Sequence, residues 1–321
     1  RCAGEVFVWG GSGVSRTMTD QARYWLGLDV GGTKIAAGIV EFPSGNLVHK
    51  RVIPTRAERP GQEVLRDALT LVRNLMEETQ AMTSPISGIG IGVCELVDLR
   101  GQVTSGYTVG WDALPVQECF TQLAPAIVEA DVRAHALAEA MFGAGASFKT
   151  FVYVTVGTGI SSSLVLDGVP FSGARGNALI LASGPNTFEC NHCHQLAEQV
   201  LENFASGPAL AARFGVTKGE DVFAASQGGD ARAEEVIRSA GAALGNSVGW
   251  LVNVLDPEAV IVGGGLGLAG NLYWQAFEAS TRAHIWSDTT RPLPILPARL
   301  GVDAGLIGAA CYAWKQFSQP H

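Results

Sequence analysis

The chain has 321 residues, of which 47% are hydrophobic and 16% charged, so it is long enough to bury two hydrophobic cores. Thirty acidic and 22 basic residues give a net charge of -8, and the sequence contains no stripe of Lys and Arg of the kind that a nucleic-acid groove requires. Nucleic acid is therefore not expected as a partner. No apolar run reaches the roughly 20 residues that span a bilayer, so no membrane partner is expected. The six cysteines, most of them in apolar segments, favour reduced thiols in a cytoplasmic protein over a disulfide framework.

Residues 1–24 are expected to be a leader or tag outside the folded domains. The segment LGLDVGGTKIAAGIV, Leu26 to Val40, then predicts a β-hairpin, because two apolar runs flank a tip of glycines and threonine. The tip residues are Gly31, Gly32 and Thr33. Their amides, the ammonium of Lys34 and the neighbouring carboxylate of Asp29 are groups that can hold phosphate and a metal ion.

The rest of the first half alternates between strands and helices. A strand is expected at Leu47–Ile53, an amphipathic helix at Gly61–Glu78 and a glycine-rich buried strand at Ile86–Val93. The glycines of that strand indicate that another backbone or a ligand approaches it closely. The strand at Pro125–Glu129 then runs into an alanine-rich helix at Val132–Phe142. Joins of this kind are where α/β sheets place their ligands.

The second half opens with FVYVTVGTGISSSLVLDG, Phe151 to Gly168, a weaker copy of the first hairpin with Gly157, Thr158 and Gly159 at its tip. A long irregular stretch, 169–193, follows. Helices are expected after it at Gln195–Phe204, Pro208–Phe214 and roughly Arg232–Leu255. A strand from Ala259 then enters the glycines 263–265, and an apolar helix with small residues begins at Asp303.

Three glycine clusters at strand ends are what a nucleotide needs for its β-phosphate, γ-phosphate and adenosine. They are the tips 31–33 and 157–159 and the turn formed by Gly263, Gly264 and Gly265. Gly-Gly pairs are also ordinary hairpin turns, which is the alternative for the first tip taken alone. The spacing matches neither a Walker A loop nor a dinucleotide-binding fingerprint. An actin-like arrangement of two duplicated halves remains.

The motifs DVGGTK, YVTVGTGI, SGARGNA, LENFASGPAL, DPEAVIVGGG and DAGLIGAA occur in an order similar to that of the ROK family, which contains bacterial glucokinases, other hexose kinases and transcriptional repressors. The resemblance covers about Leu26 to Trp314. It implies an α/β, actin-like (ribonuclease H-like) fold with an N-terminal domain of residues 25–130 plus 303–321 and a larger domain of 131–302. It also implies ATP and Mg²⁺ as cofactors, a small sugar or sugar-like substrate and a homodimer.

The resemblance places the catalytic base at Asp131, which would accept the proton of the attacking sugar hydroxyl. The structural alternative is that this aspartate caps the N-terminus of the following helix. Other family sugar contacts are replaced: Ala130 stands for an Asn, Ile180 for a Glu and Ser183 for a His. Of that set only one Glu is retained, at Glu202.

Two further residues are candidates for the substrate pocket. Tyr107 lies where family members often have a sugar-binding Asn, and Glu95 replaces the usual Gly of a Pro-Gly pair. For both, a packing or surface role is the alternative. His135, one helical turn after Asp131, is interpreted as a satisfied helix residue.

The family's structural zinc site is altered in this chain. Cys190, His192, Cys193 and His194 offer possible ligands, but Ser183 and Val200 stand where the family has a His and a Cys. A lone C-x-x-C supplies half a zinc site, so an altered Zn²⁺ site and a metal-free loop both remain open.

The residues and the resemblance together predict ATP-dependent phosphorylation of a hydroxyl on a hexose or hexose-like substrate. Because polar sugar contacts are replaced, the acceptor is expected to differ from plain glucose, for example an amino sugar or a cyclitol. A sugar-sensing protein of the same fold without catalysis is the alternative.

Overall fold

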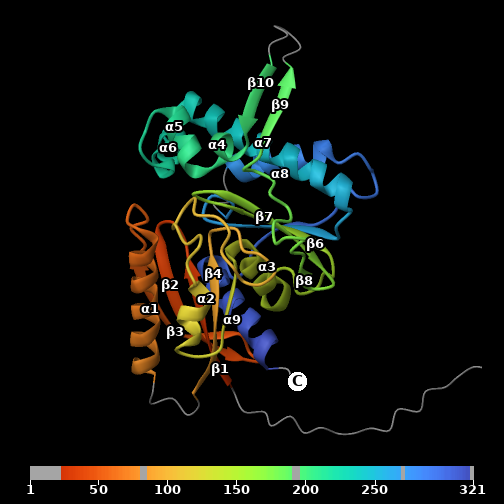
Figure 1. The fold of residues 1–321 in the computed structure, drawn as a ribbon. Coiled ribbons are helices and arrows are strands. Elements are labelled where there is room, and N and C mark those ends of the chain that lie inside the picture. The colour runs from red at the N-terminus through yellow and green to blue at the C-terminus, as the bar shows by residue number, and fades with distance from the viewer. Residues whose placement is uncertain (1–22, 80–84, 190–195, 269–271, 319–321) are drawn as a thin grey trace, which may run out of the picture.

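The computed structural model describes residues 23–79, 85–189, 196–268 and 272–318, which form two five-stranded sheets one above the other (Figure 1). The first sheet has the order β3-β2-β1-β4-β5. Its strands are β1 (Arg23–Val30), β2 (Lys34–Phe42), β3 (Asn46–Pro54), β4 (Ile86–Val93) and β5 (Ala126–Ala130). The first three strands are antiparallel, whereas β4 and β5 run parallel to β1.

The second sheet repeats this topology, reading β8-β7-β6-β11-β12. Its strands are β6 (Phe151–Val156), β7 (Ile160–Leu166), β8 (Val169–Pro170), β11 (Ala259–Gly263) and β12 (Ile295–Pro297). Again the first three are antiparallel, and the last two run parallel to the first. Both predicted hairpins are present, and the identical strand order confirms the duplicated fold.

Helices cover both faces of the first sheet. On one face lie α1 (Gly61–Glu78) and α2 (Val116–Thr121), which share a hydrophobic core with the sheet; α1 lies against β2, and α2 lies against β5. On the other lie α3 (Asp131–Phe142) and α9 (Ala304–Phe317), preceded by the short helix η1 (Gly301–Asp303). The opposite face of α3 packs on the second sheet, through Ala136 against Tyr153 and Ile261. Helix α3 therefore lies between the two sheets.

The other face of the second sheet carries a helical layer. It consists of α4 (Glu202–Ala205), α5 (Gly207–Phe214), α6 (Gly219–Gln227), α7 (Ala231–Leu255) and α8 (Leu272–His284). Helix α7 packs closely on α8, because glycines in α7 leave room for the α8 backbone. A Cβ added at Gly245 would lie 2.4 Å from the carbonyl oxygen of Phe277.

Small residues also let α9 lie directly on the first sheet, as the glycine-rich strand and the apolar final helix predict. A Cβ added at Gly90 in β4 would lie 1.7 Å from the carbonyl oxygen of Ala309, and one at Gly308 would lie 1.8 Å from that of Ala134. Both distances are far below contact, so any side chain at these positions would push α9 away from β4 and α3.

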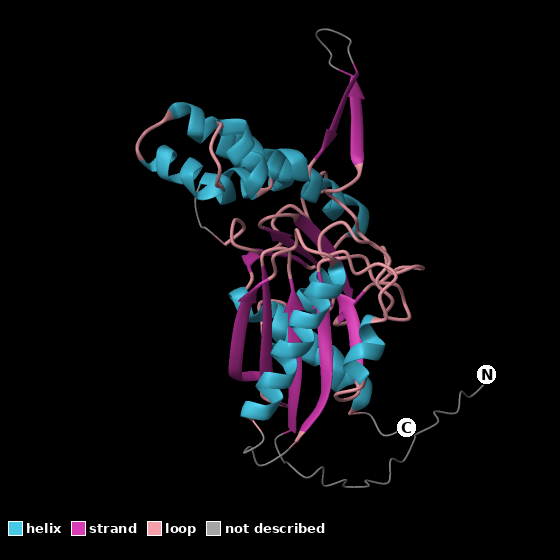
Figure 2. Ribbon diagram, turned by 60° about the vertical axis from the view of Figure 1, so that its left-hand side comes forward, coloured by secondary structure: helices cyan, strands magenta, loops and turns pink. Residues whose placement is uncertain are grey.

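One predicted helix is wrong. In place of a helix at Gln195–Phe204, the chain forms strand β10 (Leu196–Val200), paired with β9 (Pro185–Glu189) within the stretch expected to be irregular, and α4 is only one turn. Figure 2 shows this hairpin extending away from both sheets. The apolar spacing of the segment suits a helix, but antiparallel pairing with 185–189 satisfies its backbone instead. Helices α2, α6 and α8 were not predicted.

Within the described ranges no helix is both long and apolar enough to cross a membrane. Cys94, Cys119 and Cys311 carry free thiols, as their apolar surroundings predict.

Candidate active site

The first glycine tip is held in shape by a residue that the sequence did not single out. Gly31 donates its amide to the carbonyl of Lys34 at 3.0 Å, which closes the turn between β1 and β2. Thr55, fully buried just after β3, donates its hydroxyl to the carbonyl of Gly31 at 2.6 Å and its amide to that of Thr33 at 3.0 Å. The end of β3 thus fixes both sides of the tip.

The groups at this tip fit a phosphate. Among the described residues, the amides of Gly32 and Thr33 donate to no protein group, and the exposed ammonium of Lys34 forms no ion pair. Unpaired amides next to a cation are the features of a phosphate cradle. The arrangement is compatible with the nucleotide role predicted for this hairpin.

The second tip is supported by Glu202. Gly157 donates its amide to the carbonyl of Gly159 at 2.9 Å, and the carboxylate of Glu202 accepts the amide of Ile160 at 2.7 Å. The carbonyl of Gly157 in turn accepts the amide of Gly207, at the start of α5. Glu202, predicted as a substrate contact, therefore lies directly beside the Gly157–Thr158–Gly159 turn.

The third glycine cluster adjoins the second. The carbonyl of Val156 accepts the amides of Leu266 at 3.0 Å and Gly267 at 3.3 Å. Gly264 has φ of +81°, and a Cβ added there would lie 2.3 Å from the same carbonyl oxygen. A side chain at Gly264 is excluded by both the backbone angle and the contact. By contrast, a Cβ added at Gly265 would meet nothing within 4 Å, which leaves open space beside the turn.

Asp131 is the first residue of α3. Its Oδ1 accepts the amide of Val132 at 2.6 Å, but the N-cap position belongs to Ala130, and the helix has no side-chain cap. The capping alternative is therefore wrong. His135 donates from Nδ1 to the backbone carbonyl of Asp131 at 2.6 Å and stacks on Tyr153, so it is a satisfied helix residue as interpreted.

The carboxylate of Asp131, on α3, is sensitive to the charge of Asp29, on β1. Burial raises the pKa of Asp131 to about 6; His135 opposes this rise, and the negative charge of Asp29 adds to it. Helix α9 begins against Asp29, since a Cβ added at Gly305 would lie 2.5 Å from the Asp29 Oδ2. Asp131 is thus ionised at neutral pH, yet it is a stronger base than an ordinary aspartate.

Glu95 organises the loop that follows β4. Its carboxylate, 6% exposed, accepts the Ser105 hydroxyl at 2.5 Å and the amides of Tyr107, Thr108 and Val109 at 3.0, 2.6 and 2.8 Å. The side chain of Tyr107 is 90% exposed on this loop. The loop also reaches the first tip, because a Cβ added at Gly32 would lie 2.8 Å from the Thr108 methyl carbon.

The positions that replace family sugar contacts do not form a polar cluster. Ala130 is buried, whereas Ile180 is 49% exposed and Ser183 is exposed. The possible zinc ligands Cys190, His192, Cys193 and His194 lie outside the described residues. In the part of the chain that is described, no group of three or more His, Cys, Asp or Glu side chains could hold a metal ion.

Comparison with known proteins identifies the family of the chain. The family model described as "ROK family" matches residues 25–316. A glucokinase from Halalkalibacterium halodurans is 27% identical over 318 residues, 92% of this chain and 96% of that protein. An N-acetylmannosamine kinase from Yersinia pseudotuberculosis is 31% identical over 303 residues, 90% of this chain and 97% of that protein.

A solved structure shows the same fold. A ROK family glucokinase from Streptomyces griseus, in complex with glucose and AMPPNP, superimposes with a TM-score of 0.76 at 26% identity, covering 90% of this chain and 98% of that chain. The family match agrees with the repeated sheet topology and with the glycine-tipped hairpin in each half of the chain. The chain belongs to the ROK family, and its fold is the duplicated α/β fold of the actin-like ATPases.

Proposed function

We propose that the protein is an ATP-dependent sugar kinase that phosphorylates a hydroxyl of a hexose or hexose-like acceptor. The observation that carries this proposal is the pair Asp131 and Asp29. Two carboxylates, one from α3 and one from β1, lie close enough for the charge of Asp29 to raise the pKa of Asp131. Phosphoryl transfer needs one carboxylate to receive the hydroxyl proton and another to help position the metal ion.

In this proposal the tip at 31–33 and Lys34 hold phosphate groups, and the tip at 157–159 holds them from the other side. Gly263, Gly264 and Gly265 would receive the adenosine, next to the open space at Gly265. When bound, ATP supplies the phosphoryl group, and Mg²⁺ neutralises its charge. Asp131 orients the acceptor hydroxyl and accepts its proton.

The acceptor we propose is an amino sugar or a cyclitol rather than plain glucose. Ala130, Ile180 and Ser183 remove polar partners for sugar hydroxyls, and a hydrogen bond to a charged group contributes about 1.5–3 kcal/mol. Losing two such bonds would weaken glucose binding by roughly two to four orders of magnitude. The kinases among the relatives act, by name, on both glucose and N-acetylmannosamine, so the family scaffold accommodates amino sugars.

The same three replacements support a second candidate, a sugar-sensing protein that no longer catalyses transfer. Intact DVGGTK and Asp131 favour the kinase. We further propose that the protein acts in the cytoplasm as a homodimer, with its domains at 25–130 plus 303–321 and 131–302.

A screen of hexoses, amino sugars and cyclitols with ATP and Mg²⁺, read by mass spectrometry of the products, separates the two functions. The kinase proposal expects a phosphorylated product with at least one acceptor and none with the Asp131→Asn variant. Binding of a sugar without turnover of ATP would favour the sensor. Neither product nor sugar binding across the panel would overturn both.

A further inference from the structure

Arg133, two residues after Asp131, is almost completely buried at 4% exposure, and each of its guanidinium nitrogens has a partner. Nε donates to Glu129 Oε1 at 2.7 Å, and Nη2 donates to the same oxygen and to the carbonyl of Val97 at 2.9 Å. Nη1 donates to the carbonyl of Gly176 at 2.6 Å. A buried cation of this kind is stable only because its partners are all present.

These partners come from segments far apart in the chain. Val97 lies in the loop after β4, Glu129 at the end of β5, and Gly176 in the loop after β8. The two loops touch directly, since a Cβ added at Gly176, where φ is +81°, would lie 2.0 Å from the carbonyl oxygen of Val97. Arg133 thus joins a loop of the first half of the chain to a loop of the second, beside the first turn of α3.

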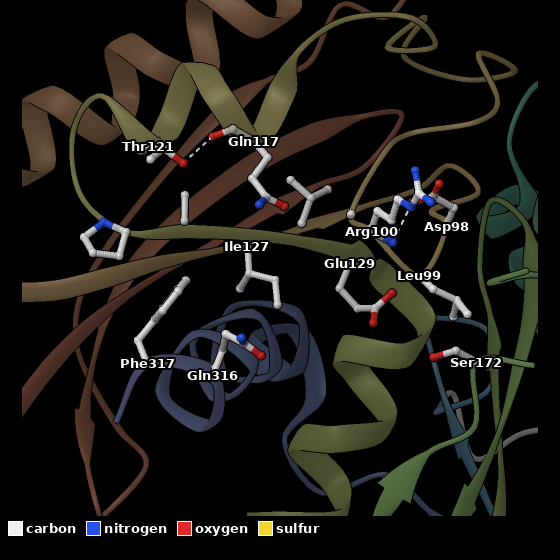
Figure 3. Close-up of a pocket in the computed structure, with 14 residues that line it drawn as sticks. Asp98, Leu99, Arg100, Gln117, Thr121, Ile127, Glu129, Ser172, Gln316 and Phe317 are labelled. Atoms are coloured by element: carbon white, nitrogen blue, oxygen red, sulfur yellow. Dashed lines mark hydrogen bonds between the residues drawn. The ribbon is translucent and has the colours of Figure 1, made fainter. Parts of the chain in front are cut away.

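Figure 3 shows where the three segments meet. A cavity of about 630 Å³ runs along the outer edge of β5 and is lined by Leu99, Glu129 and Ser172, one residue from each segment. The guanidinium of Arg133 lies beside this cavity and joins all three segments by hydrogen bonds, in addition to the direct backbone contact between the Val97 and Gly176 loops.

The loop that Arg133 holds is SGARGNA, residues 172–178. It is closed on itself by the amide of Ala178, which donates to the carbonyl of Ser172 at 3.2 Å. At its far end, the Ser162 hydroxyl donates to the carbonyl of Leu179 at 2.7 Å, which ties it to β7. The chain then continues to Ile180, which stands where the family resemblance places a sugar-contacting Glu. The loop is thus anchored to the second sheet at one end and to α3 in its middle.

We propose that Arg133 is a positioning residue that holds the 172–178 loop at a fixed position relative to Asp131 and so sets the affinity for the acceptor. This inference rests on the proposed kinase function. Arg133 touches no reacting atom. It acts by fixing the distance between the helix that carries the base and the segment that leads to the acceptor pocket. The nucleotide groups lie on other segments, so ATP binding does not depend on it.

The chain contains a matched control on α8. Arg282 donates to Glu278, four residues earlier, and to the backbone carbonyls of Arg291 and Leu293, at 2.8 and 3.2 Å. Like Arg133, Arg282 therefore has a carboxylate four residues earlier and two backbone carbonyls as partners, although its side chain is 33% exposed and that of Arg133 only 5%. Arg282 contacts neither of the two loops. Arg282→Met therefore reports what the loss of an arginine with the same kinds of partners does at a site away from the two loops.

The test compares Arg133→Met, Arg133→Lys and Arg282→Met. Without any ligand, amide hydrogen exchange in residues 172–178 should be at least tenfold faster in Arg133→Met than in the wild type and unchanged in Arg282→Met. In kinetic assays, the acceptor KM should rise about 10- to 100-fold in Arg133→Met, while the ATP KM changes less than twofold. Arg133→Lys, which keeps the charge but not the fork of donors, should restore the acceptor KM only in part.

If amide exchange in residues 172–178 were unchanged in Arg133→Met, or equally accelerated in Arg282→Met, the proposal that Arg133 holds this loop would be overturned. Faster exchange with an unchanged acceptor KM would show a purely structural role and would overturn the positioning claim. A wild-type protein that phosphorylates no sugar would overturn the proposed function instead, and the exchange measurement would still decide whether Arg133 holds the loop.

Discussion

Asp131→Asn should abolish phosphoryl transfer and at the same time stabilise the protein at neutral pH. The pKa of Asp131 rises from 3.8 to about 6 in the folded state, mainly through burial. Ionisation of this carboxyl therefore opposes folding. A pKa rise of about two units, at about 1.36 kcal/mol for each unit, means that ionising Asp131 at neutral pH destabilises the folded state by at most about 3 kcal/mol. Asparagine does not ionise, so the variant lacks this destabilisation. The amide oxygen of asparagine can still accept from Val132.

The pH dependence follows from the sign of the shift. Because the pKa of Asp131 is raised in the folded state, protonated Asp131 contributes to the free energy of unfolding of the wild type below about pH 4. This contribution is lost as the pH rises through about 6. Urea unfolding at pH 8 should give a larger free energy of unfolding for Asp131→Asn, and the gain should disappear at pH 4. In the wild type, kcat/KM should fall on acidification below about pH 6, as the base becomes protonated.

Asp98→Asn is the contrasting control. The amides of Gln102 and Arg100 lower the pKa of Asp98, so its carboxylate favours folding above its unfolded pKa and the substitution brings no gain at pH 8. If Asp131→Asn were no more stable than the wild type at pH 8, the conclusion that ionised Asp131 opposes folding would be refuted. Retained turnover would refute its role as the base.

Three further substitutions test the parts around this site. Thr55→Val removes the hydroxyl that donates to Gly31 and should weaken nucleotide binding about fivefold in calorimetry without changing the acceptor KM; an unchanged nucleotide affinity would show that the tip does not need this support. Glu95→Gln should lower the free energy of unfolding by about 1.5–3 kcal/mol and raise the acceptor KM, because an amide cannot accept the four donors that face the carboxylate; wild-type values in both assays would contradict this. Gly308→Ala places a methyl against the carbonyl of Ala134 and should cost about 1–3 kcal/mol in urea unfolding, whereas a neutral effect would mean that α9 and α3 can separate freely.

The sequence predicts the repeated hairpins well because each is local: a strand, a glycine tip and a second strand occur within 20 residues. The glycines of β4 also predict a close approach, and the backbone of α9 makes it at Ala309. Asp131 stands out because it follows a strand and begins a helix. In each case the signal lies in neighbouring residues.

Features that depend on distant partners could not be predicted in this way. Thr55 and Arg133 belong to no motif, and most of their acceptors are backbone carbonyls from remote segments, which no spacing reveals. Strand β10 has helical spacing but pairs with β9 through non-local hydrogen bonds. Glu95 was predicted as a substrate contact, and its four donors inside the protein became apparent only in three dimensions.

The decisive measurement is the transfer of a labelled γ-phosphoryl group from ATP to a sugar or cyclitol. The assay is run in parallel with the wild type and with Asp131→Asn, after calorimetry has established that both bind the nucleotide. We expect label in the acceptor with the wild type alone. Label in the acceptor with both proteins, or with neither across the panel of acceptors, would contradict it.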